Sequence, residues 1–279
     1  MKVYEIITNI ILKKLEEGTI PWQKPWNTQE SMPRNLVSKK EYQGINAFIL
    51  GCQHYSSPYW LTFKQCKDLG GNIRKGAQGT PVVYWNWQEI EEDGETEKKV
   101  PFIRYYTVFN VAQCENIPED KIPATTEATT THIDKIMQCE GIFENWEDKP
   151  EIRHGEQKAY YRPFSDLINM PQVETFTNSE EYYSTLFHEL THSTGHEKRL
   201  NRQGITEIAP FGTPLYSKEE LVAEMGAAFL CGFTGIEYAT IDNSAAYIQG
   251  WLKKLKDDKK LVIIAATQAQ KAVNYILGI

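Results

Sequence analysis

Apolar and polar positions follow regular spacings along most of the chain, and these spacings predict its elements. Over 4–17, apolar side chains recur at intervals close to 3.6 residues, which is typical of an amphipathic helix. The segments 80–88 and 102–111 are rich in β-branched and aromatic residues and predict two strands that are joined by a charged hairpin tip. Short helices are expected at 47–52 and 62–69.

The second half of the chain is dominated by helical spacing. A segment rich in Pro, Thr and acids at 119–130 interrupts the pattern, so we expect it to link two domains, 1–118 and 131–279. The segment 151–164 predicts a strand, a glycine turn and a strand. Both halves combine helices with a few strands, which indicates an α+β fold. The expected helices are 132–141, 178 or 179 to about 194, about 217 to 231 or 232, 244–255 and 261–277.

Length and composition narrow the class of protein. With 279 residues, of which 41% are hydrophobic and 24% charged, the chain is an ordinary globular protein of two domains. No apolar run reaches the ~18 residues that a membrane span needs, and the first helix lacks the signal-peptide pattern. Five scattered cysteines without C-x-x-C predict neither disulfides nor a cysteine metal site. We therefore expect a cytoplasmic protein.

The segment LFHELTHSTGHEKRL predicts a metal site, because it contains H-E-x-x-H. On a helix, residues four apart lie on the same face, so His188 and His192 can reach one metal ion with Glu189 beside it. The apolar stripe of the same helix lies nearly opposite both histidines, so they are not needed in the core. The alternative is a solvated pair of surface histidines.

A catalytic zinc site needs a third protein ligand and an open position. Glu220 and Glu224 lie one turn apart in YSKEELVAEMGAAFL, where small neighbours let two helices approach closely. Ser217 and Glu220 also fit an S-x-x-E capping box, which would engage Glu220 at the helix start and leave Glu224 as the ligand. His196 is a further candidate, but Gly195 is expected to end the helix before it. We place Glu220 first, Glu224 second and His196 third.

The sequence ELVAE resembles the E-x-x-A-D/E helix of gluzincin-type metallopeptidases. The resemblance implies that Glu220 binds zinc, or another divalent cation, and that Glu224 supports the site by orienting a histidine. It also implies that Glu189 is the general base that activates water. Tyr216, one turn before Glu220, is a candidate for stabilising an oxyanion, and the alternative is a packed tyrosine.

The N-terminal part interleaves cationic and aromatic residues. Residues 1–88 carry 11 lysines and arginines against 6 acids, whereas the remainder carries 19 against 31, so the net charge of −7 is unevenly spread. Cationic grooves with aromatic faces hold single-stranded nucleic acid by stacking of the bases. The alternative is that the aromatic residues form a core and the lysines are solvated. The candidate DNA contacts are Trp22, Trp26, Arg34, Tyr42, Trp60, Lys64, Arg74 and Lys75.

Longer blocks extend the resemblance over most of the chain. Four segments resemble successive blocks of the N-terminal domain of ArdC-type antirestriction proteins, and related domains occur in plasmid-encoded primases. In order, the segments are IILKKLEEGTIPWQKPWN, PRNLVSKKEYQGINAFIL, YWLTFKQCKDLGGNIRKGAQGTPVVYW and FNVAQCENI. The metallopeptidase domain of that family resembles FHELTHSTGHEKRLNR and YSKEELVAEMGAAFL. The similarity runs from about residue 3 to about residue 235.

The resemblance implies a protein of conjugative plasmids or similar mobile elements. Its N-terminal domain would bind single-stranded DNA, and its C-terminal domain would be a zincin-like, gluzincin-type metallopeptidase with a protein substrate such as a host restriction component. The alternative is a non-catalytic DNA-binding protein with a structural or vestigial metal site, which protects DNA by occupancy. A metal-dependent nuclease is disfavoured, because two-metal phosphoryl-transfer sites favour carboxylate-rich ligand sets.

Overall fold

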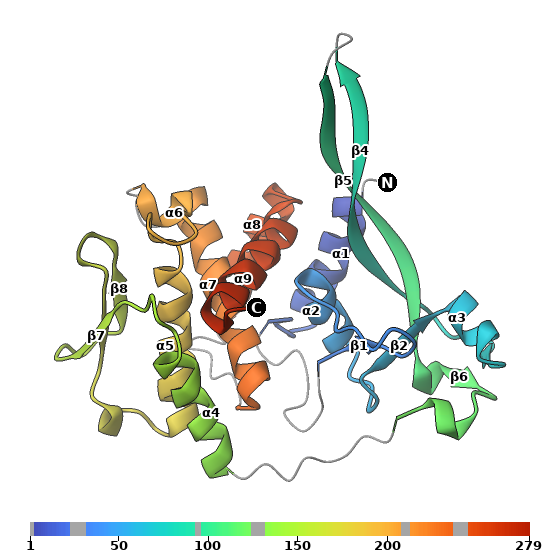
Figure 1. The fold of residues 1–279 in the computed structure, drawn as a ribbon, viewed down its shortest axis with the longest axis horizontal. Coiled ribbons are helices and arrows are strands. Elements are labelled where there is room, and N and C mark those ends of the chain that lie inside the picture. The colour runs from blue at the N-terminus through green and yellow to red at the C-terminus, as the bar shows by residue number, and fades with distance from the viewer. Residues whose placement is uncertain (1–2, 23–31, 93–95, 124–131, 208–212, 237–244) are drawn as a thin grey trace.

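A computed structural model describes residues 3–22, 32–92, 96–123, 132–207, 213–236 and 245–279 (Figure 1). Helices and strands are mixed in both halves, so the α+β class is confirmed. No helix in these ranges combines the length and apolar character that crossing a bilayer requires. All five cysteines are buried and free.

The N-terminal part is built on a four-stranded sheet of order β1-β2-β5-β4. The predicted strands β4 and β5 pair along their whole length and project from the body as a long hairpin (Figure 1). The sequence did not predict the short strands β1, β2, β3 and β6, which are two to four residues long and carry too few positions for a periodic pattern. In order, the elements are α1 (Val3–Glu16), β1 (Arg34–Asn35), α2 (Ile45–Gly51), β2 (Tyr59–Thr62), α3 (Phe63–Asp68), β3 (Asn72–Ile73), β4 (Thr80–Glu92), β5 (Thr96–Asn110) and β6 (Cys114–Glu115).

The C-terminal part consists of a small sheet beside a group of helices. The two predicted strands are present but do not pair with each other, because β9 lies between them, parallel to β7 and antiparallel to β8. The sequence LINM of β9 is buried at all four positions, so it lacks the alternation by which a strand is recognised. The elements are α4 (His132–Glu144), β7 (Glu151–His154), β8 (Tyr160–Arg162), β9 (Leu167–Met170), α5 (Ser179–Ser193), α6 (Gln203–Thr206), α7 (Pro214–Thr234), α8 (Ala245–Asp257) and α9 (Leu261–Leu277). Short 3-10 turns occur at Val111–Gln113, Glu119–Lys121, Pro163–Ser165 and Val173–Thr175.

The helix α7 begins earlier than the sequence predicted. Its first residue is Pro214, and Thr213 caps it by accepting a hydrogen bond from the backbone N–H of Tyr216. Ser217 therefore lies inside the helix, where it is buried, and the alternative of a capping box between Ser217 and Glu220 is wrong. The side chain of Glu220 is consequently not engaged as a cap.

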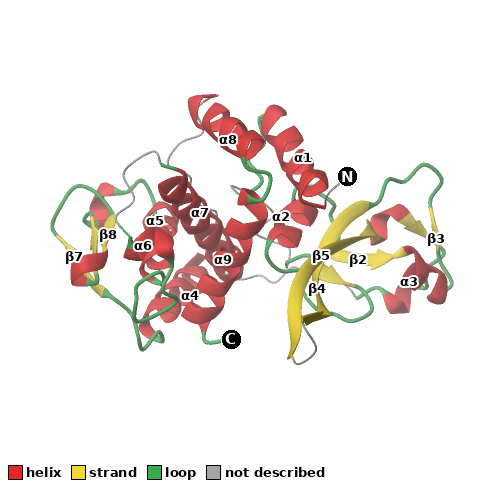
Figure 2. Ribbon diagram, turned by 90° about the horizontal axis from the view of Figure 1, so that it is seen from above, coloured by secondary structure: helices red, strands yellow, loops and turns green. Residues whose placement is uncertain are grey.

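The largest hydrophobic core is shared by both halves of the chain. It contains Ile7 and Ile11 of α1 and Phe48 of α2 together with residues of α4, α5, α7, α8 and α9. The helix α1 packs against α8 and α9, and Figure 2 shows α1 and α8 side by side. Two smaller clusters lie within the N-terminal sheet region. The N-terminal helices thus pack with the C-terminal helices. The predicted boundaries near 119–130 fall partly outside the described residues and stay a prediction.

Candidate metal centre

The two helices that carry the candidate ligands approach each other at a glycine. A Cβ atom placed on Gly226 of α7 would lie 2.4 Å from Cγ2 of Thr191 on α5, which is far inside van der Waals contact. Ala223 and Ala227 on the same helix are fully buried. These small residues set α7 close enough to α5 for a carboxylate on one helix to reach the histidines on the other.

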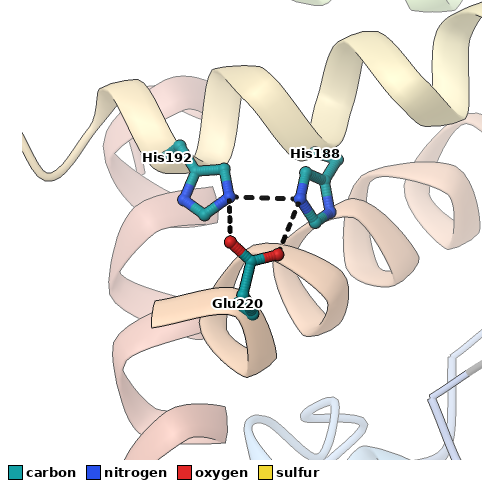
Figure 3. A group of neighbouring side chains, drawn as sticks. All are labelled: His188, His192 and Glu220. Atoms are coloured by element: carbon teal, nitrogen blue, oxygen red, sulfur yellow. Dashed lines mark hydrogen bonds and ion pairs between the residues drawn. The ribbon is translucent and has the colours of Figure 1, made fainter. Parts of the chain in front are cut away.

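Among the described residues, His188, His192 and Glu220 form a cluster of possible metal ligands (Figure 3). Both histidines come from α5, one turn apart, and Glu220 comes from α7. The two imidazole Nε2 atoms are 3.1 Å apart, and the Glu220 carboxylate oxygens lie 3.7 Å from Nε2 of His188 and 3.6 Å from Nε2 of His192. The structure thus brings the first-ranked third ligand to the histidine pair.

The three separations fit a tetrahedral divalent cation. Nitrogen and carboxylate ligands lie about 2.0–2.2 Å from Zn²⁺, so two ligands of a tetrahedral ion are about 3.3 Å apart. The observed values of 3.1, 3.6 and 3.7 Å bracket that distance. The side chain of Glu220 is 28% exposed, so solvent can reach the cluster from that side. Three ligands with one open side form the arrangement of catalytic metal sites.

The orientation of His192 is fixed by a buried ion pair that the sequence analysis missed. Nδ1 of His192 lies 3.3 Å from Oε1 of Glu219, and because a carboxylate only accepts, Nδ1 carries the proton and Nε2 is free to bind a metal. Arg202 donates to the same carboxylate, with Nη2–Oε1 and Nε–Oε2 distances of 2.6 and 3.1 Å. Burial alone would raise the Glu219 pKa, but hydrogen bonds from His192 and Arg202 hold it below its usual value. Glu219 therefore stays charged.

Arg202 also holds the end of the histidine helix. Its Nη2 donates to the backbone carbonyl of Thr191 at 2.7 Å, and its Nη1 donates to the hydroxyl of Thr194. Two glycines make room for this network, because a Cβ atom on Gly195 would lie 3.0 Å from Nη2 of Arg202 and one on Gly204 would lie 2.8 Å from Cβ of Glu219. The arginine follows the H-E-x-x-H motif within the block HEKRLNR, but its spacing gives no sign of its partner.

Glu224, the second candidate ligand, is engaged elsewhere. Its Oε2 accepts a hydrogen bond from Nε1 of Trp22 at 2.7 Å and another from the hydroxyl of Tyr247. Burial raises the Glu224 pKa, and the hydrogen bond from Tyr247 opposes that rise. In the described part of the chain Glu224 lies outside the ligand cluster, next to it on α7, and its negative charge acts on His188.

The remaining predicted site residues surround the cluster without joining it. His196 is buried beyond the end of α5, where its Nδ1 accepts a hydrogen bond from the backbone N–H of Lys198 at 3.2 Å, and it does not belong to the ligand cluster found among the described residues. The hydroxyl of Tyr216 donates to Glu220. Glu189 is buried, and its charge acts on both His188 and Tyr216, so its carboxylate lies near the ligands.

The cluster is strongly polarised toward a positive charge. Burial alone would lower the His188 pKa, but the ion pair with Glu220 and the charges of Glu189 and Glu224 raise it to about 9. Burial alone would raise the Glu220 pKa, but the two histidines and the Tyr216 hydroxyl lower it to about 2. The surrounding carboxylates thus stabilise positive charge at the point where the three ligands meet.

Three of the predicted DNA contacts are core residues, which corrects the sequence-based set. Trp22 is 0% exposed, Trp60 is 2% exposed and Tyr42 is 7% exposed, so their rings offer no face on which a base could stack. Their aromatic character serves packing, as Trp22 does by meeting Trp251 edge-on with ring centroids 5.8 Å apart. Trp26 lies outside the described residues.

The cationic residues predicted to contact DNA differ in their exposure and in the partners that they have within the chain. Nη2 of Arg34 forms an ion pair with Glu41 at 2.8 Å, and Nε of Arg74 donates to the carbonyl of Cys114 at 3.2 Å. Lys64 and Lys75 are exposed. The two lysines and, in part, the two arginines remain candidates for contact with phosphate.

The hairpin carries a strip of aromatic and cationic side chains, none of which is among the predicted DNA contacts. Tyr84 of β4 and Phe102, Arg104 and Tyr106 of β5, here called the aromatic strip, share one face because their positions pair as Tyr84↔Arg104 across the two strands. Tyr84 is 40% and Tyr106 36% exposed, with ring centroids 5.8 Å apart, and the Arg104 guanidinium lies 4.9 Å from the Phe102 ring centroid. The sequence predicted the two strands from their β-branched and aromatic residues, but it did not show which of their side chains stay uncovered.

Comparison with known proteins identifies the family. Residues 138–268 match a zincin-like metallopeptidase family, and residues 1–109 match the N-terminal domain of the anti-restriction factor ArdC. The metal-free crystal structure of the antirestriction protein ArdC from plasmid R388 is similar with a TM-score of 0.78 and 37% identity, covering 99% of this chain and 97% of that one. This chain belongs to the ArdC family of antirestriction proteins. The Mn(II)-bound crystal structure of the same relative is similar with a TM-score of 0.77 and 36% identity, over 100% of this chain and 98% of that one.

Other relatives of this chain include one protein of similar length and one much longer protein. It is 30% identical to the protein y4eC of Sinorhizobium fredii (strain NBRC 101917 / NGR234), over 98% of this chain and 91% of that protein. It is 34% identical to the DNA primase TraC of Escherichia coli over 99% of this chain, but it spans only 27% of the length of that primase. The ArdC-type arrangement, with its zincin-like part, therefore occurs both nearly alone and within longer chains.

Proposed function

We propose that this ArdC-family chain is a zinc-dependent peptidase whose ligands are His188, His192 and Glu220. The observation that carries the proposal is the cluster of these three side chains, whose separations fit a tetrahedral ion with one open side. The Mn(II)-bound relative supports a divalent cation in this family. Two neutral imidazoles and one carboxylate are the ligand set that favours zinc in hydrolytic sites.

Each side chain around the cluster has a task in hydrolysis. The divalent cation, when bound, supplies Lewis acidity that makes water more acidic and polarises a carbonyl group. Glu189 takes the proton of the attacking water, since its carboxylate is buried beside His188 and offers a base where the substrate would lie. The Tyr216 hydroxyl can donate a hydrogen bond to the developing oxyanion once it shifts away from Glu220.

The test of this proposal is the substitution Glu189→Gln in the full chain. The amide keeps the size of the side chain and leaves the three ligands intact, so the variant should still bind zinc, with an affinity reduced by the loss of the nearby Glu189 charge. Loss of the general base should reduce hydrolysis at saturating zinc by about 10²–10⁴-fold. The readouts are zinc affinity by chelator competition and transfer of an unmodified plasmid into a restricting host, with recipient proteins followed by mass spectrometry. Glu197→Gln, at an exposed position just beyond α5, is the matched control.

The outcome distinguishes the two functional classes. If Glu189→Gln abolishes protection of the plasmid and stabilises a host protein that the wild type removes, the chain acts as a peptidase. If protection survives undiminished, the metal site is structural and the chain protects DNA by occupancy alone.

We further propose that the N-terminal part binds single-stranded DNA on the aromatic strip. Bases stacked on aromatic side chains contribute about 1–3 kcal/mol each, and Arg104 adds a cation beside the rings of the strip. Residues 1–88 carry 11 cationic against 6 acidic residues, and this positive excess attracts phosphate although the net charge of the whole chain is −7.

Stacking on the strip is tested by alanine substitutions on the two faces of the hairpin. The double variant Tyr84→Ala/Tyr106→Ala should weaken binding of a labelled oligonucleotide by tenfold or more, because about 1.4 kcal/mol is a factor of ten and two stacking faces are removed. Tyr105→Ala removes a tyrosine that is 47% exposed on the opposite face of β5 and should change affinity by less than threefold. Equal losses in both variants would refute the assignment of the strip.

A further inference from the structure

The helix α7, which carries Glu220, is in contact with the N-terminal segment through one carboxylate oxygen of Glu224. Oε2 of Glu224 accepts hydrogen bonds from Nε1 of Trp22, at 2.7 Å, and from the hydroxyl of Tyr247. Both donors are neutral and sit on planar, rigid side chains. We call Trp22, Tyr247 and Glu224 the carboxylate clamp.

The two donors belong to elements outside the helix pair that carries the ligands. Trp22 is 202 positions away from Glu224 along the chain and follows α1, whereas Tyr247 lies on α8. Both rings pack against Trp251, which they meet at interplanar angles of 86° and 74°. Since α1 itself packs against α8, the clamp belongs to one rigid aromatic unit that joins the N-terminal segment to α8.

The clamped carboxylate lies close enough to influence the ligands. Glu224 follows Glu220 by one turn on α7, and its negative charge acts on His188. A carboxylate held by two donors has a fixed position, so its charge stays directed at the same place in the site. Groups that hydrogen-bond a metal ligand directly commonly change metal affinity by about 10–100-fold when they are removed. Trp22 and Tyr247 act one step further out, through the charge of Glu224 on His188, so we expect an effect at the lower end of that range.

We propose that Trp22 and Tyr247 are positioning residues of the metal centre, so that the N-terminal segment sets the affinity of the zincin-like part for its cation. This inference rests on the proposed metal site and adds its regulation. Any ligand that displaces Trp22 must change metal affinity, and by linkage the metal must change the affinity of that ligand by the same factor. The N-terminal part and the metal centre are therefore coupled through Glu224.

The experiment uses Trp22→Phe in the full-length chain. Phenylalanine keeps an aromatic ring against Trp251 but removes the Nε1 donor, so we expect the affinity for Zn²⁺ to fall by about tenfold. Tyr247→Phe removes the other donor with little change in shape, and it should weaken Zn²⁺ binding in the same direction. Trp60→Phe is the matched control, because Trp60 is equally buried but belongs to the separate cluster with Tyr42 and Val82.

Two measurements separate positioning from loss of stability. The thermal unfolding midpoint of the metal-free variants reports packing, and Zn²⁺ affinity with the visible spectrum of the Co²⁺-loaded chain reports ligand geometry. The proposal requires that Trp22→Phe and Trp60→Phe lower the midpoint comparably while only Trp22→Phe weakens Zn²⁺ binding and alters the Co²⁺ spectrum. Should Trp22→Phe fail to fold, Tyr247→Phe decides by the same two measurements.

The failure of this inference differs from the failure of the proposed function. If the wild-type chain binds no divalent cation, the proposed function is wrong. If the wild type binds Zn²⁺ and both clamp variants bind it with unchanged affinity and spectrum, the metal site stands and the clamp is refuted.

Discussion

The buried ion pair between Arg202 and Glu219 gives the sharpest prediction for stability. Arg202 is 7% and Glu219 5% exposed, and the guanidinium makes two contacts of 2.6 and 3.1 Å to the carboxylate. Arg202→Met keeps the length of an apolar side chain but leaves the Glu219 charge buried without its cation. Removing one partner of such a pair typically costs about 3–5 kcal/mol.

The measurement is urea unfolding of the metal-free chain. We expect the free energy of unfolding of Arg202→Met to fall by about 3–5 kcal/mol, and the thermal midpoint to fall by roughly 6 °C or more. The matched control is Arg34→Met, which breaks the ion pair between Arg34 and Glu41. Its Nη2–Oε1 distance of 2.8 Å is similar to the distances in the Arg202–Glu219 pair, but the two side chains are 26% and 49% exposed. Exposed pairs contribute about 0–1 kcal/mol, so the control should lose less than 1 kcal/mol.

A double variant separates stability from the orientation of His192. Arg202→Met/Glu219→Leu removes both charges, and replacing a buried pair by apolar residues is commonly neutral, so stability should recover. His192 loses its Nδ1 partner only in this double variant, because Arg202→Met alone keeps Glu219, so the Zn²⁺ affinity of the double variant should fall to about 10–100-fold below the wild type. The reasoning is refuted if Arg202→Met unfolds like Arg34→Met, or if the double variant binds Zn²⁺ as the wild type does.

Two further predictions concern the metal-free chain and the contact between α5 and α7. The His188 pKa is raised to about 9 in the folded chain, so the contribution of His188 to stability is complete below about pH 6.5 and is lost as the pH rises through 9. The Glu220 pKa is lowered to about 2, so Glu220 contributes to stability above about pH 4.5 and loses that contribution as the pH falls toward 2. Thermal midpoints of the metal-free chain should therefore decline from pH 6.5 to 9, and a His188→Ala variant that declines equally would contradict this assignment. Gly226→Ala places a Cβ atom 2.4 Å from Cγ2 of Thr191 and should weaken Zn²⁺ binding by forcing α7 away from α5. The control is Gly250→Ala on α8, where a Cβ atom meets open space. It should leave Zn²⁺ affinity unchanged, and stability should be unchanged or slightly raised. Equal Zn²⁺ affinity of Gly226→Ala and the wild type would show that the close approach is not needed for the site.

Several helices and the pair of histidines on α5 could be predicted from the sequence alone. Helical geometry places His188 and His192 on one face at four-residue spacing, and it fixed α5 and α9 to within a residue or two of their observed ends. The same geometry identified α7 as the source of a carboxylate. These features depend on neighbours within one or two turns, so the spacing of residues along the chain is sufficient to predict them.

Only the tertiary structure decided which side chains meet. The choice of Glu220 over Glu224 and His196 depends on how α7 packs against α5 at Gly226, and the pairing of Arg202 with Glu219 joins residues 17 positions apart on separate elements. The burial of Trp22 and its hydrogen bond to Glu224, 202 positions away, show that a residue expected to contact DNA packs in the core beside α7. The large apolar ring of a tryptophan favours burial, but the surface against which it packs is set by the arrangement of helices that are distant in sequence.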